Sequence, residues 1–300
     1  MKWLEITITT APPAVEAIAD LLLACRSGGV AEEAAPSGRV RLRAYVPTGP
    51  AMKATLHAVR DLLRRLPEFG LDAGPATVET TEIDDEGWAH AWKDHFRPFA
   101  VGRLWITPTW DRRPPPEDGV VIELDPGMAF GSGLHPSTQM CLQVLDSLCR
   151  DGSSGLVGTV FDIGTGSGIL AIAAARLGAS RVLARDNDPT SVEVARRNVA
   201  HNRVADRVTV EEGDLLAGVE ERAQLILANL TAELHLVFLP QARLHLLAPG
   251  RLAASGIVAE RVPVVEAAAR AAGFAVLQTL RSGEWRCLVL APTPAAGPVR

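Results

Sequence analysis

The chain has little cysteine, no long apolar run and no excess of positive charge, and each absence excludes a class of protein. Its four cysteines show no C-x-x-C spacing, so they are best interpreted as reduced thiols. No apolar run reaches the roughly 18 residues of a membrane span, and the N-terminus lacks a signal-peptide pattern. A net charge of −5 and the lack of an aromatic-basic patch argue against direct nucleic-acid binding. We expect a cytoplasmic protein with no membrane or nucleic-acid partner.

Metal ligands are also absent from the sequence pattern. The seven histidines are scattered, and none has acidic or cysteine partners at the spacing of a metal site. We therefore predict no metal. The remaining composition is ordinary for a globular protein, with 47% apolar and 22% charged residues. A length of 300 residues fits one large domain or two.

The most informative stretch is an apolar run that ends in Asp162 and is followed by Gly164, Gly166 and Gly168. An alanine-rich helical pattern continues from Leu170 to Leu177. A strand, a glycine turn and a helix in this order predict the nucleotide-binding corner of a doubly wound α/β sheet. Glycine lets the backbone approach a ligand where a Cβ atom would clash. Many turns of this kind carry glycine for geometry alone, so the residues around it must identify the ligand.

The position of Asp162 identifies a positively charged ligand. A carboxylate at the strand end repels a diphosphate and attracts the ammonium and sulfonium groups of S-adenosylmethionine. Ile169 stands where a dinucleotide motif needs a small residue, and no Lys-Ser/Thr pair of a P-loop follows the turn. We therefore predict an S-adenosylmethionine site at Asp162, Gly164 and Gly166. A NAD-dependent oxidoreductase and a non-catalytic sensor of adenosyl ligands are the alternatives from other classes.

Two acidic segments farther along the chain fit the same kind of site. Asp186 closes a short strand about twenty residues after the glycine turn, where an acid accepts hydrogen bonds from ribose hydroxyls. Asp188 precedes Pro189 and is interpreted as a helix N-cap. Asp214 follows a third strand and could reach the adenine amino group. The alternative for Asp186 is a purely structural role in the turn.

Asn229 ends the buried strand that begins near Gln224. In this architecture an Asn at the mouth of the fourth strand lies beside the sulfonium of the cofactor. Its side-chain oxygen can accept an N–H from a target amine and direct the nitrogen lone pair at the methyl carbon. The alternative interpretation is that Asn229 caps the helix that begins near Ala232.

The first eighty or so residues form a different unit. Alternating apolar residues predict strands at Leu4–Ile8, Val40–Val46 and Thr77–Ile83, with a further short strand near Val30. Helical periodicity predicts two helices, at 14–25 and 52–66. The order β-α-β-β-α-β is that of a ferredoxin-like unit. Such a module commonly binds a macromolecular substrate, but packing or dimerisation is the alternative.

Two segments lie between this unit and the glycine turn. Trp88, Trp92 and Phe96 recur at helical spacing and predict a helical linker. The glycine-rich loop from Asp125 to Thr138 leads into a helix, and it can fold over a ligand as a lid. Ser137 and Thr138 stand where a helix N-cap is expected, and capping does not exclude contact between Thr138 and the ligand.

Five of these motifs, in this order and spacing, resemble the bacterial PrmA family. They are Asp125-Pro-Gly-Met-Ala-Phe-Gly-Ser-Gly-Leu-His-Pro-Ser-Thr138, Asp162-Ile-Gly-Thr-Gly-Ser-Gly168, Asp186-Asn-Asp-Pro189, Ala228-Asn-Leu-Thr231 and Glu284-Trp285. Members of that family methylate the ribosomal protein of the large-subunit stalk base, number eleven of its set. Arg185, directly before the ribose acid, is unusual for the family. It either pairs with Asp186 or points to solvent.

The resemblance implies a S-adenosylmethionine-dependent N-methyltransferase that acts on lysine side chains and an N-terminal amine of that ribosomal protein. Another protein or a small-molecule amine is the alternative substrate. The resemblance implies cofactor contacts at Thr138, Gly164, Asp186 and Asn229, with Asn229 as the catalytic residue.

The expected fold is a class I methyltransferase, a Rossmann-like seven-stranded α/β sheet preceded by the ferredoxin-like α+β domain. We expect a substrate-recognition domain at 1–83, a linker at 84–100, a methyltransferase domain at 101–291 and a disordered tail at 292–300. We expect a monomer.

Overall fold

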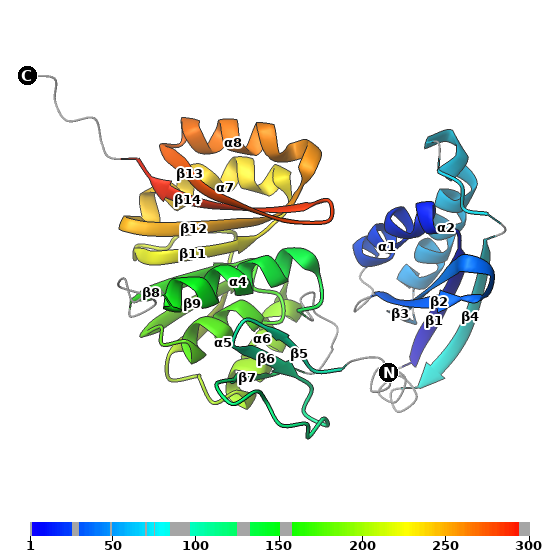
Figure 1. Ribbon diagram of the computed structural model, residues 1–300, viewed down its shortest axis with the longest axis horizontal. Helices are drawn as coiled ribbons and strands as arrows, with labels where there is room; N and C mark the ends of the chain where they lie inside the picture. Colours follow the sequence, from blue (N-terminus) through cyan, green and yellow to red (C-terminus); the bar gives the residue numbers. More distant parts are fainter. Residues whose placement is uncertain are drawn as a thin grey trace, which may run out of the picture. The chain divides into compact units, whose positions relative to one another are not determined.

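The computed structural model describes residues 2–25, 30–48, 50–69, 71–74, 76–84, 97–124, 133–150 and 158–293. The chain divides near Arg97 into two compact units, each of which has its own sheet and helices (Figure 1). Trp88, Trp92 and Phe96 of the predicted linker helix lie outside the described residues, as do tail residues 294–300. Among the helices that the structure describes, none is long and apolar enough to cross a membrane.

In the described part of the first unit, four antiparallel strands form a sheet in the order β2-β3-β1-β4, together with two α-helices. Leu4, Ile6 and Ile8 alternate along β1, and their buried side chains pack with Ile18 of α1 and Val59 of α2. The apolar side of each strand is therefore covered by the helices. The elements are β1 (Lys2–Thr10), η1 (Pro12–Ala14), α1 (Val15–Ala24), β2 (Val30–Ala35), η2 (Pro36–Gly38), β3 (Arg39–Pro47), α2 (Pro50–Arg65), η3 (Leu66–Phe69) and β4 (Thr77–Asp84).

The second unit is built on one large sheet, which confirms the predicted mixed α/β fold. Its strand order is β10-β9-β8-β11-β12-β14-β13. The pairs from β10 to β12 are parallel, and β14 runs antiparallel to both of its neighbours. The strands are β8 (Thr159–Ile163), β9 (Arg181–Asp186), β10 (Val208–Glu212), β11 (Ala223–Asn229), β12 (Leu246–Val258), β13 (Phe274–Ser282) and β14 (Trp285–Pro292).

Within the described residues, five helices accompany this sheet in two groups. In the first group α5 lies against both α4 and α6, whereas α7 and α8 lie against each other. Phe161 and Leu183 of the sheet share a buried cluster with Phe238 of α7 and Val265 of α8. The helices are α4 (Pro136–Arg150), α5 (Ile169–Arg176), α6 (Pro189–His201), α7 (Ala232–His245) and α8 (Val262–Ala271), with the 3-10 turn η4 (Ala259–Arg261) before α8.

A small three-stranded sheet also belongs to the second unit. It consists of β5 (Phe99–Val101), β6 (Leu104–Thr107) and β7 (Val120–Glu123). Arg103, between β5 and β6, donates from Nε to Asp146 Oδ1 of α4 at 2.8 Å. Asn202 donates from Nδ2 to the carbonyl oxygen of Glu123 at 2.7 Å, which fixes β7 beside the end of α6. These bonds attach the small sheet to the helices that flank the large one.

The order of the large sheet reverses between β8 and β11. From β8 the chain continues outward through β9 and β10, and then returns to form β11 on the other side of β8. In open α/β sheets, ligands bind at the carboxyl ends of the strands at such a reversal point. The register aligns Asp162 of β8 with Leu227 of β11, and Ile163 with Ala228. The glycine turn and Asn229 therefore follow at the same edge of the sheet.

Candidate functional site

Asp162 is fully buried at the end of β8, and only one of its carboxylate oxygens is used by the fold. Oδ2 accepts hydrogen bonds from Thr165 Oγ1 at 2.6 Å and from the backbone N–H of Ala171 at 3.0 Å. Oδ1 is buried and has no hydrogen-bond partner within the described part of the chain. Burial raises the pKa of Asp162 to about 7, and the hydrogen bonds from Thr165 and Ala171 oppose that rise. Because Oδ1 is buried and receives no hydrogen bond from the described residues, a cationic partner would stabilise the ionised carboxylate.

The glycine turn directly after Asp162 packs closely against neighbouring elements. Gly164 has a φ of +74°, which favours glycine, and a Cβ atom there would lie 2.6 Å from Leu230 Cδ2. Gly168 has a φ of +83°, and a Cβ atom there would lie 3.3 Å from the Cβ of Ala195 in α6. The first position allows the turn to pass close to Leu230. The second allows α5 and α6 to pack closely.

Asp186 ends β9 beside this turn and is half-buried. Its Oδ2 accepts from the N–H of Gly166 at 2.9 Å, and its Oδ1 accepts from the N–H of Asp188 at 3.0 Å. An ionised carboxylate offers about four acceptor positions, so these two bonds leave capacity for a ligand. Asp188 is the N-cap of α6 and accepts from the N–H of Thr190 at 3.2 Å, as the sequence predicted. Asp186 therefore has a structural role in the turn as well as free acceptor positions.

Asn229 and Thr138 meet at the end of β11. Asn229 Nδ2 donates to Thr138 Oγ1 at 3.1 Å, and Thr138 is buried. Thr231, not Asn229, is the N-cap of α7. A Cβ atom at Gly256 would lie 2.9 Å from Asn229 Oδ1, so glycine at that position leaves the amide oxygen uncovered. The structure thus fixes the amide of Asn229 and excludes the capping interpretation.

The beginning of α4 differs from the sequence prediction. The helix begins at Pro136, so Ser137 and Thr138 lie in its first turn instead of at the N-cap. The carbonyl of His135 accepts from the N–H groups of Thr138 and Gln139, at 3.0 and 3.1 Å. Proline is favoured at the first helical position because its φ is already helical and its missing N–H would have no partner there. The loop residues 125–132, including Phe130 of the predicted lid, lie outside the described residues.

A buried set of polar groups supports Asn229 and Thr138, and the sequence did not reveal it. His235 Nε2 bonds the carbonyl oxygen of Ser255 at 2.8 Å, and Ser255 Oγ donates to the carbonyl oxygen of Ser137 at 2.9 Å. Burial lowers the pKa of His235 to about 4, so the ring is neutral near pH 7. Ser255 is paired in register with Asn229 on the neighbouring strand. The first turn of α4 is thereby attached to the end of the sheet where Asn229 lies.

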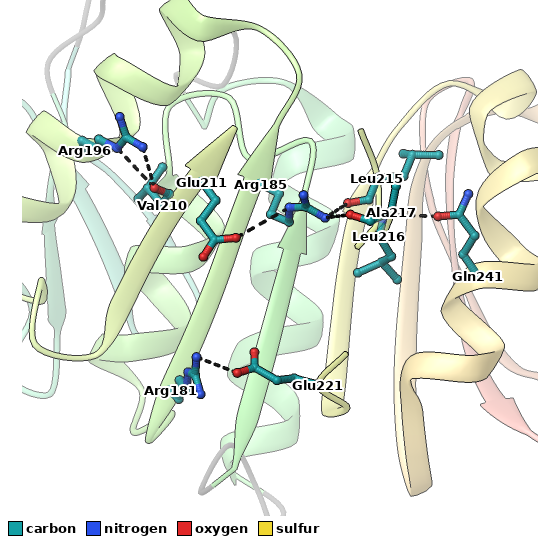
Figure 2. A network of polar contacts seen from close by, with 10 residues as sticks. All are labelled: Arg181, Arg185, Arg196, Val210, Glu211, Leu215, Leu216, Ala217, Glu221 and Gln241. Carbon is teal, nitrogen blue, oxygen red and sulfur yellow. Dashed lines mark hydrogen bonds and ion pairs between the residues drawn. The ribbon is translucent and has the colours of Figure 1, made fainter. Parts of the chain in front are cut away.

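Arg185 follows neither of the two orientations that the sequence suggested. It is buried, with 8% of its surface exposed, and it neither pairs with Asp186 nor points to solvent. Its Nη1 instead donates to the carbonyl oxygens of Leu215 and Ala217, each at 3.0 Å, as Figure 2 shows. The alternation of side chains along β9 places Arg185 beside the turn after β10, whereas Asp186 faces the glycine turn.

The edge of the large sheet therefore brings together most of the predicted site residues. Asp162, Gly164, Gly166 and Asp186 surround one turn, and Asn229 lies with Thr138 at the end of the adjacent strand. Thr165, Ser255 and His235 complete the arrangement. Among the described residues, no group of three or more His, Cys, Asp or Glu side chains is placed to hold a metal ion. The site offers a buried anion, a close backbone and a fixed amide.

Comparison with known proteins gives a consistent result. A family model described as ribosomal protein L11 methyltransferase (PrmA) matches residues 2–293. The ribosomal protein L11 methyltransferase of Pelotomaculum thermopropionicum is 40% identical over 311 residues, covering 96% of this chain and 98% of that protein. The Exiguobacterium sibiricum protein of the same name is 36% identical over 315 residues, with coverage of 96% and 98%. A solved ribosomal protein L11 methylase from Lactobacillus delbrueckii subsp. bulgaricus shares 36% identity at a TM-score of 0.60, covering 66% of this chain and 100% of that chain.

Proposed function

Since the chain belongs to the ribosomal protein L11 methyltransferase family, it is an S-adenosylmethionine-dependent protein methyltransferase, and we propose how its residues perform that reaction. The proposed acceptors are lysine side chains and the N-terminal amine of ribosomal protein L11. The observation that carries the proposal is the buried Oδ1 of Asp162, which has no partner among the described residues and lies at the reversal point of the sheet. An anionic oxygen there suits a cationic cofactor and opposes a diphosphate.

We propose that the two units correspond to the two domains inferred from the sequence. The β-α-β-β-α-β order and the strand order β2-β3-β1-β4 support a ferredoxin-like classification of the first unit, with substrate recognition as its role. The strand order of the large sheet, with its antiparallel β14, supports a class I methyltransferase domain. We propose that the enzyme is a cytoplasmic monomer whose substrate is the ribosomal protein of the large-subunit stalk base.

The residues present fit S-adenosylmethionine. In the proposal Asp162 Oδ1 accepts from the cofactor's ammonium group, which gives this buried carboxylate the partner that the fold does not supply. Gly164 and Gly166, which both have positive φ, would let the backbone approach the ligand, and Asp186 would use its free acceptor positions for the ribose hydroxyls. Thr138, whose Oγ1 accepts from Asn229, contacts the cofactor beside the reacting centre.

Asn229 is the proposed catalytic residue. When bound, the cofactor would supply a methyl group on a positively charged sulfur. The amine nitrogen of the substrate attacks that methyl carbon in line, the carbon–sulfur bond breaks with S-adenosylhomocysteine as the leaving group, and the proton of the amine passes to water. Asn229 Oδ1 accepts an N–H from that amine, while Nδ2 remains bonded to Thr138 Oγ1, so the amide cannot rotate freely. Holding the nitrogen lone pair toward the methyl carbon lowers the entropic part of the barrier, a contribution of up to roughly 7–11 kcal/mol in well-oriented reactions.

The target amine must lose a proton before it reacts. A free lysine has a pKa of about 10.4, so nearly all of it is protonated at neutral pH. Burial in a pocket that also holds a cation lowers this pKa, and water carries the proton away. His235 is too deeply buried to take part, and its hydrogen bond goes to Ser255. We therefore propose no dedicated general base.

Cofactor affinity is expected to depend on pH through Asp162. Its pKa of about 7 is raised by burial, and only the ionised form attracts a cation. Binding thus requires proton loss below about pH 7, so affinity falls by up to about tenfold for each pH unit below it and levels off above it. Calorimetric titration with S-adenosylhomocysteine between pH 5.5 and pH 8 measures this dependence. A wild-type affinity that stays constant across the range contradicts the assignment.

The activity is tested by mass spectrometry of purified ribosomal protein L11 after incubation with the enzyme and isotope-labelled S-adenosylmethionine. We expect labelled methyl groups on lysine side chains and on the N-terminal amine. L11 with a chemically blocked N-terminus serves as the control for the second position. Methylation of other ribosomal proteins, with none on L11, would overturn the proposed substrate while leaving the cofactor site intact.

A further inference from the structure

Arg185 of β9 connects the turns that follow its two neighbouring strands, β8 and β10. Its backbone carbonyl accepts hydrogen bonds from the N–H groups of Gly164 and Thr165, at 2.9 and 3.0 Å. Its guanidinium group donates to the carbonyl oxygens of Leu215 and Ala217 (Figure 2). The same residue therefore bonds the glycine turn through its main chain and the turn after β10 through its side chain.

The turn after β10 depends on side chains that come from other elements. Leu215 has a φ of +48°, an unfavourable value for a residue other than glycine. Gln241 of α7 accepts through Oε1 from the N–H of Leu216 at 3.2 Å, from the side opposite Arg185 (Figure 2). Two flanking side chains thus stabilise a turn whose own backbone geometry is strained.

Gly213 and Arg185 are fitted to each other. A Cβ atom at Gly213 would lie within bonding distance of Arg185 Nη2, so only glycine allows the guanidinium group to occupy this place. The N–H of Gly213 donates to the carbonyl oxygen of Asp186 at 2.9 Å. The turn is consequently attached both to Arg185 and to the residue proposed to bind the ribose.

The guanidinium group is not explained by an ion pair. Its nearest described carboxylate is Glu211, whose Oε2 lies 4.0 Å from Nε and whose side chain is 50% exposed. Burying a charge is unfavourable unless it is hydrogen-bonded. The hydrogen bonds of the Arg185 guanidinium group go to the carbonyl oxygens of Leu215 and Ala217. A residue that served only to fill space at this position would not need a charge. The contacts indicate that Arg185 acts on the conformation of the turn.

We propose that Arg185 is a positioning residue that holds residues 213–217 so that Asp214 meets the amino group of the cofactor's adenine. Asp214 begins this turn, and its carbonyl oxygen accepts from the N–H of Ala217 at 3.0 Å. The carbonyl of Ala217 in turn accepts from Arg185, so the guanidinium group and Asp214 are linked through one residue. This inference rests on the proposed cofactor site, and it extends that site to selection of the base.

The test compares S-adenosylhomocysteine with S-inosylhomocysteine, in which an oxygen replaces the adenine amino group. The wild-type enzyme is expected to bind the adenosyl compound at least about tenfold more tightly, because a carboxylate accepts from an amino group and repels a carbonyl. In Arg185→Met that preference falls to about threefold or less. The KM for S-adenosylmethionine rises, and kcat at saturating cofactor changes by less than about threefold, since Asn229 is untouched.

Matched variants separate positioning from loss of charge. Arg181→Met removes a cation from the same strand, where Arg181 Nη2 lies 2.8 Å from Glu221 Oε1 and the side chain is 54% exposed. It should keep the base preference of the wild-type enzyme. Gly213→Ala displaces the guanidinium group without removing it and should reduce the preference as Arg185→Met does.

The outcomes distinguish this inference from the proposed function. A wild-type enzyme that binds neither compound refutes the cofactor site itself. A wild-type preference that persists unchanged in Arg185→Met and Gly213→Ala overturns the positioning role alone. If Arg185→Met does not fold, Arg185→Lys is tested for the same ratio of affinities for the adenosyl and inosyl compounds. Lysine keeps the charge but cannot reproduce the planar geometry of the guanidinium group, so the preference should again fall. A lysine variant with the full wild-type preference would also overturn the inference.

Discussion

Asn229→Ala is expected to reduce kcat about 10²-fold, a loss typical of misplacing one reactant by about 1 Å. The dissociation constant of S-adenosylhomocysteine should change by less than about threefold, because the buried carboxylate of Asp162 provides the main attraction. The structure supports this separation, since within the described part of the chain the Asn229 side chain bonds through Nδ2 to Thr138 Oγ1, and glycine at position 256 leaves no Cβ atom against Oδ1. Single-turnover kinetics and calorimetry measure the two quantities.

Thr231→Ala is the matched control for this prediction. Thr231 lies two residues beyond Asn229 and is exposed, and its Oγ1 accepts from the N–H of Leu234 at 3.4 Å as the N-cap of α7. Its loss should cost about 1 kcal/mol of stability and leave kcat unchanged. If Asn229→Ala instead weakens cofactor binding as much as it slows turnover, Asn229 only holds the cofactor.

Asp162→Asn is expected to abolish cofactor binding without unfolding the protein. Removing one member of a buried charge pair costs about 3–5 kcal/mol, which corresponds to a loss of at least roughly 100-fold in affinity. The amide oxygen can still accept from Thr165 and Ala171, but an N–H₂ group then replaces the oxygen that has no partner in the described chain. Two donors would face the ammonium of the cofactor. Calorimetry with S-adenosylhomocysteine measures the loss.

The same substitution should preserve or raise the stability of the unliganded protein above pH 7. Because burial raises the folded-state pKa of Asp162 to about 7, above its ordinary value near 3.9, this carboxyl contributes stability at low pH that is lost as the pH rises through 7. Asparagine does not titrate, so the variant does not lose this stability as the pH rises. Urea denaturation at pH 5.5 and pH 8 should show a smaller pH dependence for Asp162→Asn than for the wild type. A variant that is unfolded at pH 8 would assign Asp162 a structural role instead.

Local sequence patterns predicted the parts of the site whose structure is set by residues close to each other in the sequence. Strand, glycine turn and helix around Asp162 follow from periodicity and from the backbone freedom of glycine at Gly164. The cap at Asp188 follows from the proline after it. The same rule, applied to Pro136, would have placed the start of α4 correctly, but the glycine-rich stretch before it obscured the boundary.

Contacts between residues far apart in the sequence could not be predicted from local patterns. Ser255 Oγ bonds to the carbonyl of Ser137, which lies 118 positions away, and only the register of the parallel strands brings them together. The carbonyl of Ser255 also bonds to the buried ring of His235, a contact that nothing in the sequence around His235 indicates. Arg185 was misassigned because alternation along β9 sets its direction, and its partners come from a turn thirty residues later.

A crystal structure of the complex with S-adenosylhomocysteine tests the central claim most directly. The account predicts that the ligand's ammonium group lies within hydrogen-bond distance of Asp162 Oδ1, with the ribose hydroxyls on Asp186. A ligand bound elsewhere, or one whose amino group points away from Asp162, would contradict it.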